Sequence, residues 1–359
     1  MSKKRVLLGL SGGVDSAVAA HLLLSEGYEV IGAFMKCWSG DHGFDPCWID
    51  DRRDALRVGA QLGIPVETFD YEDAYREHVT EYMYREYAAG RTPNPDVLCN
   101  SMVKFEFLSR DAQQMGCDFI ATGHYARTRK NKDGTVSLLK GIDVKKDQSY
   151  FLHRLTQKQL SNVLFPIGVM KKDEVRAVAR EHDLCVADKR STRGICFVGN
   201  VALKTFLKER LPIVKGNIVD VEGNVLGEHD GVQFFTIGQR KGFGVGGGKP
   251  YYVVDKNAET NVVTVAAGSD HPALFTKLAS LIDVHWINTP DLSCDLRGLV
   301  RYLHDGESVV LNDACNVVSF DQPVKSVPPG QFLVVYQGDE CMGGGIIDSV
   351  SNSIDLPEK

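Results

Sequence analysis

Hydrophobic and polar positions along about the first 120 residues follow two different periods. Runs of consecutive apolar residues, typical of buried strands, alternate with segments in which apolar side chains recur every three or four positions, as in helices. The apolar runs predict strands over Arg5–Leu10, Tyr28–Met35, Ile64–Phe69 and Cys117–Thr122. The helical pattern predicts helices over Val14–Glu26, Asp51–Leu62, Tyr71–Ala89, Val103–Met115, Lys171–His182 and Val201–Arg210. This alternation favours an α/β fold with a parallel sheet covered by helices on both faces.

The pattern changes after about residue 211. Short β patterns replace the helical ones, and 18 of the 35 glycines fall in residues 212–359. Such segments are typical of small β-barrels or sandwiches. The clearest of these β patterns are Tyr251–Val254, Val262–Ala266 and Gln331–Tyr336. A break near Pro272–Leu281 then predicts three domains: an α/β domain over 1–200, a central β-rich domain over 201–276 and a β-barrel over 277–359.

The composition is that of an ordinary globular protein, with 43% hydrophobic and 25% charged residues in a chain of 359. That length favours two or three domains over one core. The apolar runs are far shorter than a membrane span. The first of them, Val6–Leu10, is also shorter than the roughly 7–15 residues of a signal peptide. We therefore expect a cytoplasmic protein.

Charge is distributed unevenly within an overall net charge of −6. Residues 124–193 contain 16 Lys and Arg against 8 Asp and Glu, a net charge of +8, which leaves −14 for the rest. A basic segment in an acidic protein is compatible with local docking of RNA. The alternative is a set of solvated helix faces.

The sharpest local motif is Ser11-Gly-Gly-Val-Asp-Ser16, between a predicted strand and a predicted helix. Several backbone N–H groups gather at the helix N-terminus, and the absence of side chains at Gly12 and Gly13 lets an anion approach, so the loop is suited to hold phosphate. It lacks the lysine of a Walker A motif. It resembles instead the loop of the PP-loop ATP pyrophosphatases. The alternative is that the motif is only a tight turn between strand and helix, with an N-cap and no bound phosphate. A second cluster, Gly242–Gly248, is followed by no predicted helix and reads as a hairpin or loop.

Two of the nine cysteines have settings that favour a thiolate. Cys99 follows the turn signal Asn94-Pro95 and precedes Asn100 and Ser101, either of which can cap a helix. We therefore expect the Cys99 thiol just before a helix N-terminus, where the pKa of a thiol is lowered. Asp96 is near enough in sequence to act as acid or base. Cys196 follows three cationic residues, Lys189, Arg190 and Arg193.

No C-x-x-C occurs, so no metal site is predicted. We interpret the other seven cysteines as structural, and we expect most of the cysteines to be free, buried thiols. The alternative for both Cys99 and Cys196 is a structural cysteine without a catalytic role, and the signal for a reactive thiol is weaker at Cys196. Two activated thiols and an ATP loop together suggest sulfur chemistry, in which a carbonyl oxygen is adenylated, a persulfide supplies sulfur, and a second thiol resolves the S–S bond.

Taken together, the motifs resemble those of the tRNA-specific 2-thiouridylases, the bacterial MnmA family. The resemblance covers nearly the whole chain. It is carried by Gly9–Ser16, Asn94–Asn100, Ala121–Tyr125, Lys146–Leu152, Gly194–Phe197, Gly238–Gly242, Arg301-Tyr302 and Cys341–Ile346. The fold that it implies is a PP-loop domain, a small central β-domain and a C-terminal β-barrel.

The resemblance also implies roles for single residues. Cys99 would be the nucleophile and Cys196 the persulfide carrier. The residues that would contact ATP are Gly9, Leu10, Ser11, Gly12, Gly13, Val14, Asp15, Ser16, Met35 and Gly123. The residues that would contact tRNA are Asn94, Pro95 and Asp96 at the target base, and His124, Lys146, Asp147, Gln148, Arg301, Tyr302 and Gln337 elsewhere.

The implied reaction is the ATP-dependent 2-thiolation of the wobble uridine in the tRNAs for lysine, glutamate and glutamine. ATP with Mg²⁺ would be the co-substrate, and a cysteine desulfurase or a sulfur-relay protein would be the persulfide donor. Two other classes of function remain. One is another PP-loop enzyme, such as an amide synthetase or a lysidine-type tRNA ligase, which needs no pair of cysteines. The other is a nucleotide-binding module without activity, which leaves the C-terminal β-rich half unexplained.

Overall fold

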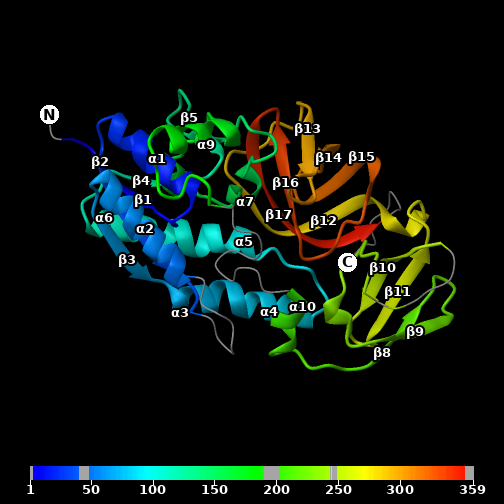
Figure 1. The fold of residues 1–359 in the computed structure, drawn as a ribbon. Coiled ribbons are helices and arrows are strands. Elements are labelled where there is room, and N and C mark those ends of the chain that lie inside the picture. Colours follow the sequence, from blue (N-terminus) through cyan, green and yellow to red (C-terminus); the bar gives the residue numbers. More distant parts are fainter. Residues whose placement is uncertain (1–2, 40–47, 190–202, 243, 245–248, 352–359) are drawn as a thin grey trace.

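The computed structural model describes residues 3–39, 48–189, 203–242, 244 and 249–351 (Figure 1). An α/β unit occupies the N-terminal half, and two β units follow it in the chain. The barrel lies against the α/β unit, and the smaller β unit lies below the barrel in the view of Figure 1, where it also contacts the α/β unit. No helix in these ranges is long and apolar enough to cross a membrane.

The N-terminal sheet has five parallel strands in the order β3–β2–β1–β4–β7. The strands are β1 (Arg5–Gly9), β2 (Glu29–Lys36), β3 (Val66–Asp70), β4 (Phe119–Thr122) and β7 (Val163–Leu164). Val6, Leu7 and Leu8 of the central strand are fully buried, because helices cover both faces. One face packs against α1 (Val14–Ser25), α2 (Trp48–Leu62) and α9 (Lys172–Glu181).

The other face of the sheet packs against two longer helical runs, each with a π-helical turn inside it. One comprises α3 (Glu72–Tyr75), the π turn Arg76–Thr80 and α4 (Glu81–Ala88). The other comprises α5 (Pro95–Leu98), the π turn Cys99–Lys104 and α6 (Phe105–Gln114). The sequence predicted the first run as one helix but began the second at Val103. The second run starts eight residues earlier, which matters for Cys99.

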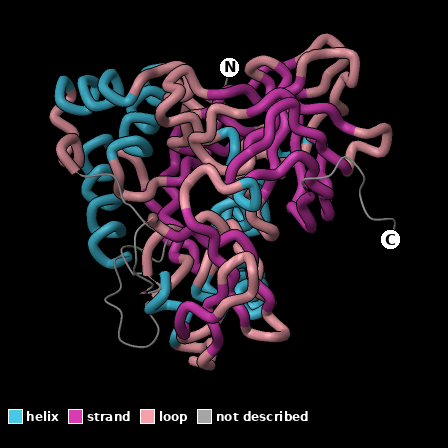
Figure 2. Tube along the Cα trace, turned by 90° about the vertical axis from the view of Figure 1, so that its right-hand side faces the viewer, coloured by secondary structure: helices cyan, strands magenta, loops and turns pink. Residues whose placement is uncertain are grey.

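Three further elements connect the sheet to the rest of the molecule, and the sequence pattern predicted none of them. They are the hairpin β5 (Ala126–Lys130) and β6 (Val136–Lys140), and the short helices α7 (Ser149–Leu152) and α8 (Gln157–Ser161). Strand β6 pairs antiparallel with the last barrel strand, with Leu139 opposite Glu340. The hairpin therefore adds two strands of the N-terminal unit to the barrel sheet. In the turned view of Figure 2, long helices (cyan) gather at the left and most strands (magenta) lie to their right.

The small middle unit is a four-stranded sheet in the order β10–β11–β8–β9. Its strands are β8 (Gly216–Val219), β9 (Val225–His229), β10 (Tyr251–Asn257) and β11 (Val262–Ala267). Its core is built from Ile218, Val253, Val263 and Val265, all fully buried. Helix α10 (Leu203–Lys208) precedes the sheet and packs on α4, where Phe206 stacks on Tyr84 with ring centroids 5.3 Å apart.

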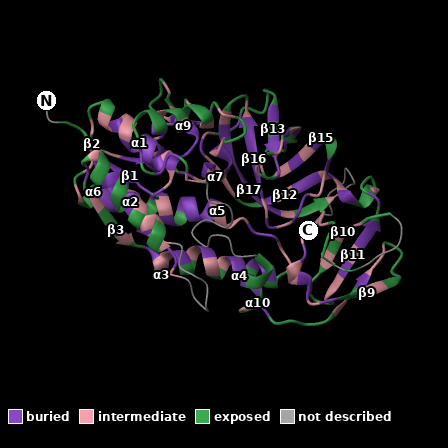
Figure 3. Cartoon of the chain, in the orientation of Figure 1, coloured by how far each residue is buried: buried purple, intermediate pink, exposed green. Residues whose placement is uncertain are grey.

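Six strands form a closed barrel in the order β12–β15–β14–β13–β16–β17, with β12 also paired to β17. The strands are β12 (Phe275–Trp286), β13 (Leu296–Leu299), β14 (Glu307–Leu311), β15 (Val317–Lys325), β16 (Phe332–Gln337) and β17 (Glu340–Ser351). Neighbouring backbones approach closely at Gly344, where an added Cβ would lie 2.0 Å from the Leu333 carbonyl oxygen. The barrel interior is packed with side chains such as Ala279, Val318 and Val335. Buried positions colour much of the barrel strands in Figure 3.

The predicted fold class is confirmed: a parallel-sheet domain, a small β-domain and a C-terminal barrel follow one another. The exact domain boundaries stay predictions. The expectation that most of the cysteines are buried fails for the described ones among the remaining seven: Cys37 and Cys341 are buried, but Cys117 and Cys315 are partly exposed and Cys185 and Cys294 are exposed. Most of the second glycine cluster and Cys47 lie outside the described residues.

Candidate active site

The loop Ser11–Ser16 lies at the carboxyl end of β1, where α1 begins. Gly13 occupies the N-cap position of α1 in an extended conformation. The loop is closed by its two serines: the Ser11 backbone N–H donates to Ser16 Oγ (3.2 Å), and Ser16 Oγ donates to the Gly13 carbonyl (3.1 Å). Backbone N–H groups at the start of a buried, 12-residue helix therefore border an open turn, as phosphate binding requires.

The two glycines of the loop face different surroundings. Gly12 has φ +72°, and an added Cβ would lie 2.2 Å from the Asp51 carbonyl oxygen of α2. At Gly13 an added Cβ would meet only Ser11 Oγ, at 3.5 Å. The sequence predicted that the missing side chains of both glycines open the loop to phosphate. This prediction is wrong for Gly12, because the space that its missing side chain leaves is occupied by the backbone of α2. Only Gly13 faces the open side of the loop.

The other residues predicted to contact ATP gather around this loop at the ends of neighbouring strands. Met35, near the end of β2, packs over Gly9, where an added Cβ would lie 3.2 Å from Met35 Cε. Gly123 follows β4 and passes the start of α1 so closely that its Cβ would lie 2.8 Å from Ser16 N. Leu10 and Val14 are buried, so only their backbone can face a ligand.

Two lysines approach the loop, although the sequence motif contains none. Lys172 at the start of α9 donates to both Asp15 carboxylate oxygens, at 2.6 and 2.7 Å, and Tyr125 donates to the same carboxylate at 2.8 Å. Lys189 donates to the Gly12 carbonyl oxygen at 3.0 Å. Neither lysine could be predicted from the sequence motif, because 157 and 177 residues separate them from their partners Asp15 and Gly12.

Cys99 is fully buried and lies inside a helical run, as the first residue of its π turn. The expectation that it precedes a helix N-terminus capped by Asn100 or Ser101 is therefore wrong. The helix begins at Pro95, and the two side chains donate backwards, Asn100 Nδ2 to the Asp96 carbonyl (3.0 Å) and Ser101 Oγ to the Val97 carbonyl (3.0 Å). Proline at the first helical position was the signal that could have placed this start.

The segment just before Cys99 is attached to the barrel. The Thr92 N–H donates to the Pro329 carbonyl at 2.9 Å, and Asn94 Nδ2 donates to Gln331 Oε1 at 3.3 Å. Asn94, Pro95 and Asp96 thus occupy the first turn of the helix where the N-terminal domain meets the barrel. They are partly exposed, whereas Cys99, one turn further on, lies in the core that also contains Met35.

His124 is placed in the interior, and its burial does not favour the predicted contact with tRNA. Its Nδ1 lies 2.7 Å from Thr122 Oγ1, and its ring packs against Phe105 and Phe165. Burial, with a smaller effect of the Lys104 charge, lowers the pKa of His124 well below its usual value. The imidazole is therefore neutral, and its observed contacts are structural, beside the phosphate loop.

Lys146, Asp147 and Gln148 form a loop that enters α7, and only the first projects into solvent. Asp147 Oδ1 accepts from the backbone N–H groups of Gly141 (2.9 Å) and Ser149 (3.1 Å), while burial raises the pKa of its carboxyl group. Gln148 Oε1 accepts from the Tyr125 N–H at 3.0 Å. Asp147 and Gln148 thus shape the loop that presents Lys146.

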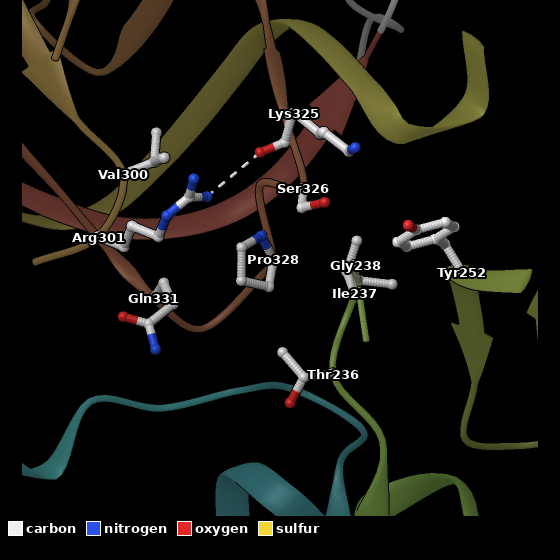
Figure 4. Close-up of a pocket in the computed structure, with 10 residues that line it drawn as sticks. All are labelled: Thr236, Ile237, Gly238, Tyr252, Val300, Arg301, Lys325, Ser326, Pro328 and Gln331. Carbon is white, nitrogen blue, oxygen red and sulfur yellow. Dashed lines mark hydrogen bonds between the residues drawn. The ribbon is translucent and has the colours of Figure 1, made fainter. Parts of the chain in front are cut away.

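Arg301 borders an open cleft of about 420 Å³ between the barrel and the middle domain (Figure 4). Lys325 lies on the same wall, with its Nζ 5.2 Å from the ring centroid of Tyr252 on the opposite wall. Gln331, which bonds to Asn94, forms the end of the cleft nearest the helix of Cys99. Within the described part of the chain, neither Arg301 nor Lys325 has an ion-pair partner, so the cleft offers two uncompensated cations.

Tyr302 and Gln337 lie on the barrel side of the same region. The Tyr302 ring packs on Phe151 of α7, with centroids 4.5 Å apart, and burial raises its pKa to about 12. Gln337 ends β16 beside the junction with β6. Cys196 lies outside the described residues, so its distance from Cys99 stays untested. Within the described ranges, no group of three or more His, Cys, Asp or Glu side chains is arranged to hold a metal ion.

Three family models match successive parts of the chain. They are described as a tRNA methyl transferase HUP domain (residues 4–200), a tRNA methyl transferase PRC-barrel domain (204–267) and an aminomethyltransferase beta-barrel domain (277–347). The first match and the phosphate loop define the N-terminal half as a HUP-type, ATP-using domain. The other two agree with the small β-domain and the closed barrel.

Curated relatives extend the likeness over almost the whole chain. The tRNA-specific 2-thiouridylase MnmA of Pseudomonas fluorescens is 46% identical over 356 residues, which covers 96% of this chain and 94% of that protein. MnmA 1 of Geobacillus kaustophilus is 47% identical over 361 residues, covering 98% and 97%. The chain belongs to the tRNA-specific 2-thiouridylase family, and with it to the tRNA-uridine 2-sulfurtransferases.

Among solved structures, the U34-tRNA thiolase NcsA from Methanococcus maripaludis, with its [4Fe-4S] cluster, matches with 20% identity and a TM-score of 0.35. The match covers 50% of this chain and 57% of that one. So distant a likeness carries no argument about the reaction of this chain.

Proposed function

We propose that this protein replaces the 2-oxygen of the wobble uridine with sulfur in the tRNAs for lysine, glutamate and glutamine. The observation that carries the proposal is the position of the helical turn Asn94–Cys99. It connects the core beneath the phosphate loop with the edge of the barrel, and Gln331 of the barrel bonds to Asn94. A base bound at Asn94, Pro95 and Asp96 would lie one helical turn from the Cys99 thiol.

ATP supplies the leaving group. The uridine 2-oxygen attacks the α-phosphorus of ATP, pyrophosphate leaves, and C2 then carries AMP, a better leaving group than the original oxygen. Backbone N–H groups of Gly12–Ser16 hold the phosphates, with Mg²⁺ as the counterion of ATP. This step needs the base close to the loop, and a base in the single-stranded anticodon loop can be splayed out for it.

Sulfur arrives as a persulfide on Cys196, delivered by a cysteine desulfurase or a relay protein. The terminal sulfur attacks C2 and AMP leaves, so that the base is joined to Cys196 through an S–S bond. The Cys99 thiolate attacks the Cys196 sulfur, which releases 2-thiouridine and leaves a Cys99–Cys196 disulfide. An external thiol reductant then restores both cysteines for the next turnover.

Arg301, Tyr302 and Gln337 are proposed to hold the RNA on the barrel side. The two uncompensated cations of the cleft, Arg301 and Lys325, suit a phosphate, and Tyr252, whose ring lies under the Lys325 ammonium group, forms the opposite wall. Lys146 adds a cation on the N-terminal side. The contacts would then extend from one domain to the other on both sides of the target base.

The proposal is tested by mass spectrometry of bulk tRNA from cells without this protein. We expect 2-thiouridine to disappear from the three tRNAs and to return with the wild-type gene. Normal levels in cells that hold no second thiolase would contradict the proposed function.

The roles of the two cysteines are tested with Cys99→Ser, Cys196→Ser and the matched control Cys294→Ser, whose cysteine is exposed on the barrel. Loss of a covalent catalyst should lower thiolation by roughly 10³-fold or more, and the control should stay at the wild-type rate. Cys196→Ser should accept no persulfide yet still release pyrophosphate with ATP and tRNA. Cys99→Ser should load sulfur on Cys196 without completing transfer. Peptide mapping that finds the extra sulfur on Cys99 would reverse the two roles.

A further inference from the structure

Lys189 forms the back wall of the phosphate loop together with the start of α2. Its Nζ donates to Asp51 Oδ1 at 2.8 Å, to Asp54 Oδ2 at 2.7 Å and to the Gly12 carbonyl oxygen at 3.0 Å. The lysine side chain is 27% exposed and the two carboxylates 30% and 19%. An ammonium group has three donors, so these three contacts use all of them.

The contact with the Gly12 carbonyl also fixes the direction of the next amide. In a trans peptide the C=O and N–H groups point in opposite directions, so a Gly12 carbonyl held toward Lys189 turns the Gly13 N–H away from it. The back of the loop is the side of α2, where a Cβ on Gly12 would lie 2.2 Å from the Asp51 carbonyl. The side of Gly13 is open, since a Cβ there meets only Ser11 Oγ.

A peptide bond between two glycines has the least intrinsic preference for one orientation, so a hydrogen bond to its carbonyl, such as that from Lys189, has the most effect there. Glycine occupies positive and negative φ about equally, so a Gly–Gly peptide can rotate and present its carbonyl oxygen instead of its N–H to the ligand. A carbonyl facing a phosphate would repel it. The lysine is protonated in this setting: burial by itself lowers the pKa of Lys189, but the hydrogen bonds to Asp51 and Asp54 outweigh it and raise the pKa.

We propose that Lys189 is a positioning residue for ATP, which holds the Gly12–Gly13 peptide with its N–H directed at the bound phosphates. The role rests on the proposed function only in that ATP occupies this loop. Lys189 does not touch the nucleotide. It acts through the peptide, and Asp51 and Asp54 hold its ammonium group in place.

The path of the chain at Lys189 is fixed independently of the lysine side chain. Arg176 of α9 donates to the carbonyl oxygens of Ala187 (2.8 Å) and Lys189 (3.1 Å). Replacing the lysine side chain therefore removes the contact with the loop and leaves the backbone anchored. This separation makes the proposal testable, because Cys196 follows only seven residues later.

The test compares Lys189→Met, which keeps the length and loses the charge, with Arg180→Met as the matched control. Arg180 makes an exposed ion pair with Asp188, next to Lys189, and has no contact with the loop. We expect Lys189→Met to bind ATP roughly 10- to 100-fold more weakly by isothermal titration calorimetry, the range for a lost hydrogen bond to a charged group. The KM for ATP should rise equally, with kcat at saturating ATP within about twofold of wild type. The control should leave ATP binding unchanged.

Persulfide loading of Cys196 is measured on the same proteins, and should be normal in Lys189→Met because the chain path is kept. Unchanged ATP affinity, or a loss of kcat with unchanged KM for ATP, would overturn the proposal. If thermal unfolding shows that Lys189→Met does not fold, Lys189→Gln takes its place. The shorter glutamine amide can bond to the two carboxylates but cannot also reach the Gly12 carbonyl, so we expect the same loss of ATP affinity. Normal ATP affinity in Lys189→Gln would overturn the proposed role. A wild-type protein that binds no ATP would instead contradict the proposed function itself.

Discussion

Gly12 and Gly13 are adjacent, yet each is a glycine for a different physical reason. Gly12 has a positive φ and lies against the backbone of α2, while Gly13 has an ordinary extended conformation and borders the open side of the loop. The sequence indicates only that both lack side chains. Which one serves the fold and which one the ligand depends on the position of α2.

Substitutions at the two glycines should therefore fail in different ways. Gly12→Ala should lower the free energy of unfolding by about 1–3 kcal/mol or more, from the left-handed backbone and the clash with Asp51. Gly13→Ser should keep the stability, because serine is a good N-cap residue, while its side chain enters the phosphate side and weakens ATP binding. Thermal unfolding and ATP titration of both variants check this. A Gly13→Ser protein that binds ATP normally would show that the phosphates lie elsewhere.

Cys99 lies inside a helical run, one turn after its start at Pro95. The sequence predicted Cys99 just before a helix N-terminus capped by Asn100 or Ser101, but both side chains donate to carbonyls of the preceding turn. The π turn that starts at Cys99 is not visible in a hydrophobic pattern of period 3.6. Such turns are frequent at functional sites, which agrees with the proposed role of the thiol.

At the scale of elements, the hairpin β5–β6 decides how the N-terminal domain and the barrel fit together. Glu340 at the start of β17 accepts hydrogen bonds from Arg129 (2.6 Å), Ser137 (2.7 Å) and Asn288 (2.9 Å). Its side chain is only 19% exposed. One carboxylate thus joins both hairpin strands to the barrel.

We expect Glu340→Gln to weaken this junction by about 1–3 kcal/mol, since an amide has one acceptor oxygen and no charge for Arg129. The neighbouring Asp339→Asn is the control; that carboxylate is 72% exposed in its ion pair with Arg127, and such pairs contribute about 0–1 kcal/mol. Urea unfolding gives the free energies, and hydrogen exchange in residues 126–140 reports the junction itself. Equal effects of the two substitutions would mean that Glu340 does not hold the hairpin.

The pairing of β6 with β17 could not be predicted from the sequence. About 200 residues separate Leu139 from its partner Glu340, and any exposed strand edge of suitable length satisfies the same local pattern. Helices and strands with strong periodicity were predicted because their pattern is local. Short elements such as α7 and α8 carry too few positions for either period to be recognised.

At the scale of the whole molecule, the proposed RNA contacts lie on both sides of the helix of Cys99. Lys145 and Lys146 are exposed on the N-terminal side, and Arg301 with Lys325 lies in the cleft on the barrel side. An acidic protein with cations gathered in this way can bind a polyanion locally despite its net charge of −6.

Affinity for tRNA should accordingly fall steeply with salt, because contacts with phosphates release counterions. Reversing two charges, with Lys145→Glu and Lys146→Glu together, should weaken binding and reduce the slope of log Kd against log salt by roughly 1–2. Lys4→Glu is the control, since Lys4 is exposed at the end of β1 that faces away from the loop. Filter binding at several salt concentrations measures the slopes. A slope equal to that of wild type in the double variant would leave these lysines as solvated surface.

The sequence by itself determined the fold class, the order of the three domains, the phosphate loop and the two cysteines worth testing, because each is encoded in a local pattern or in one continuous motif. The tertiary structure alone decided that Lys172 and Lys189 support the loop, that Gln331 of the barrel reaches Asn94, and that His124 is buried and neutral. These relations join residues from 157 to 237 positions apart, or depend on which face of an element is covered. Local periodicity has no information about such distances, whereas packing of the buried faces against one another sets them.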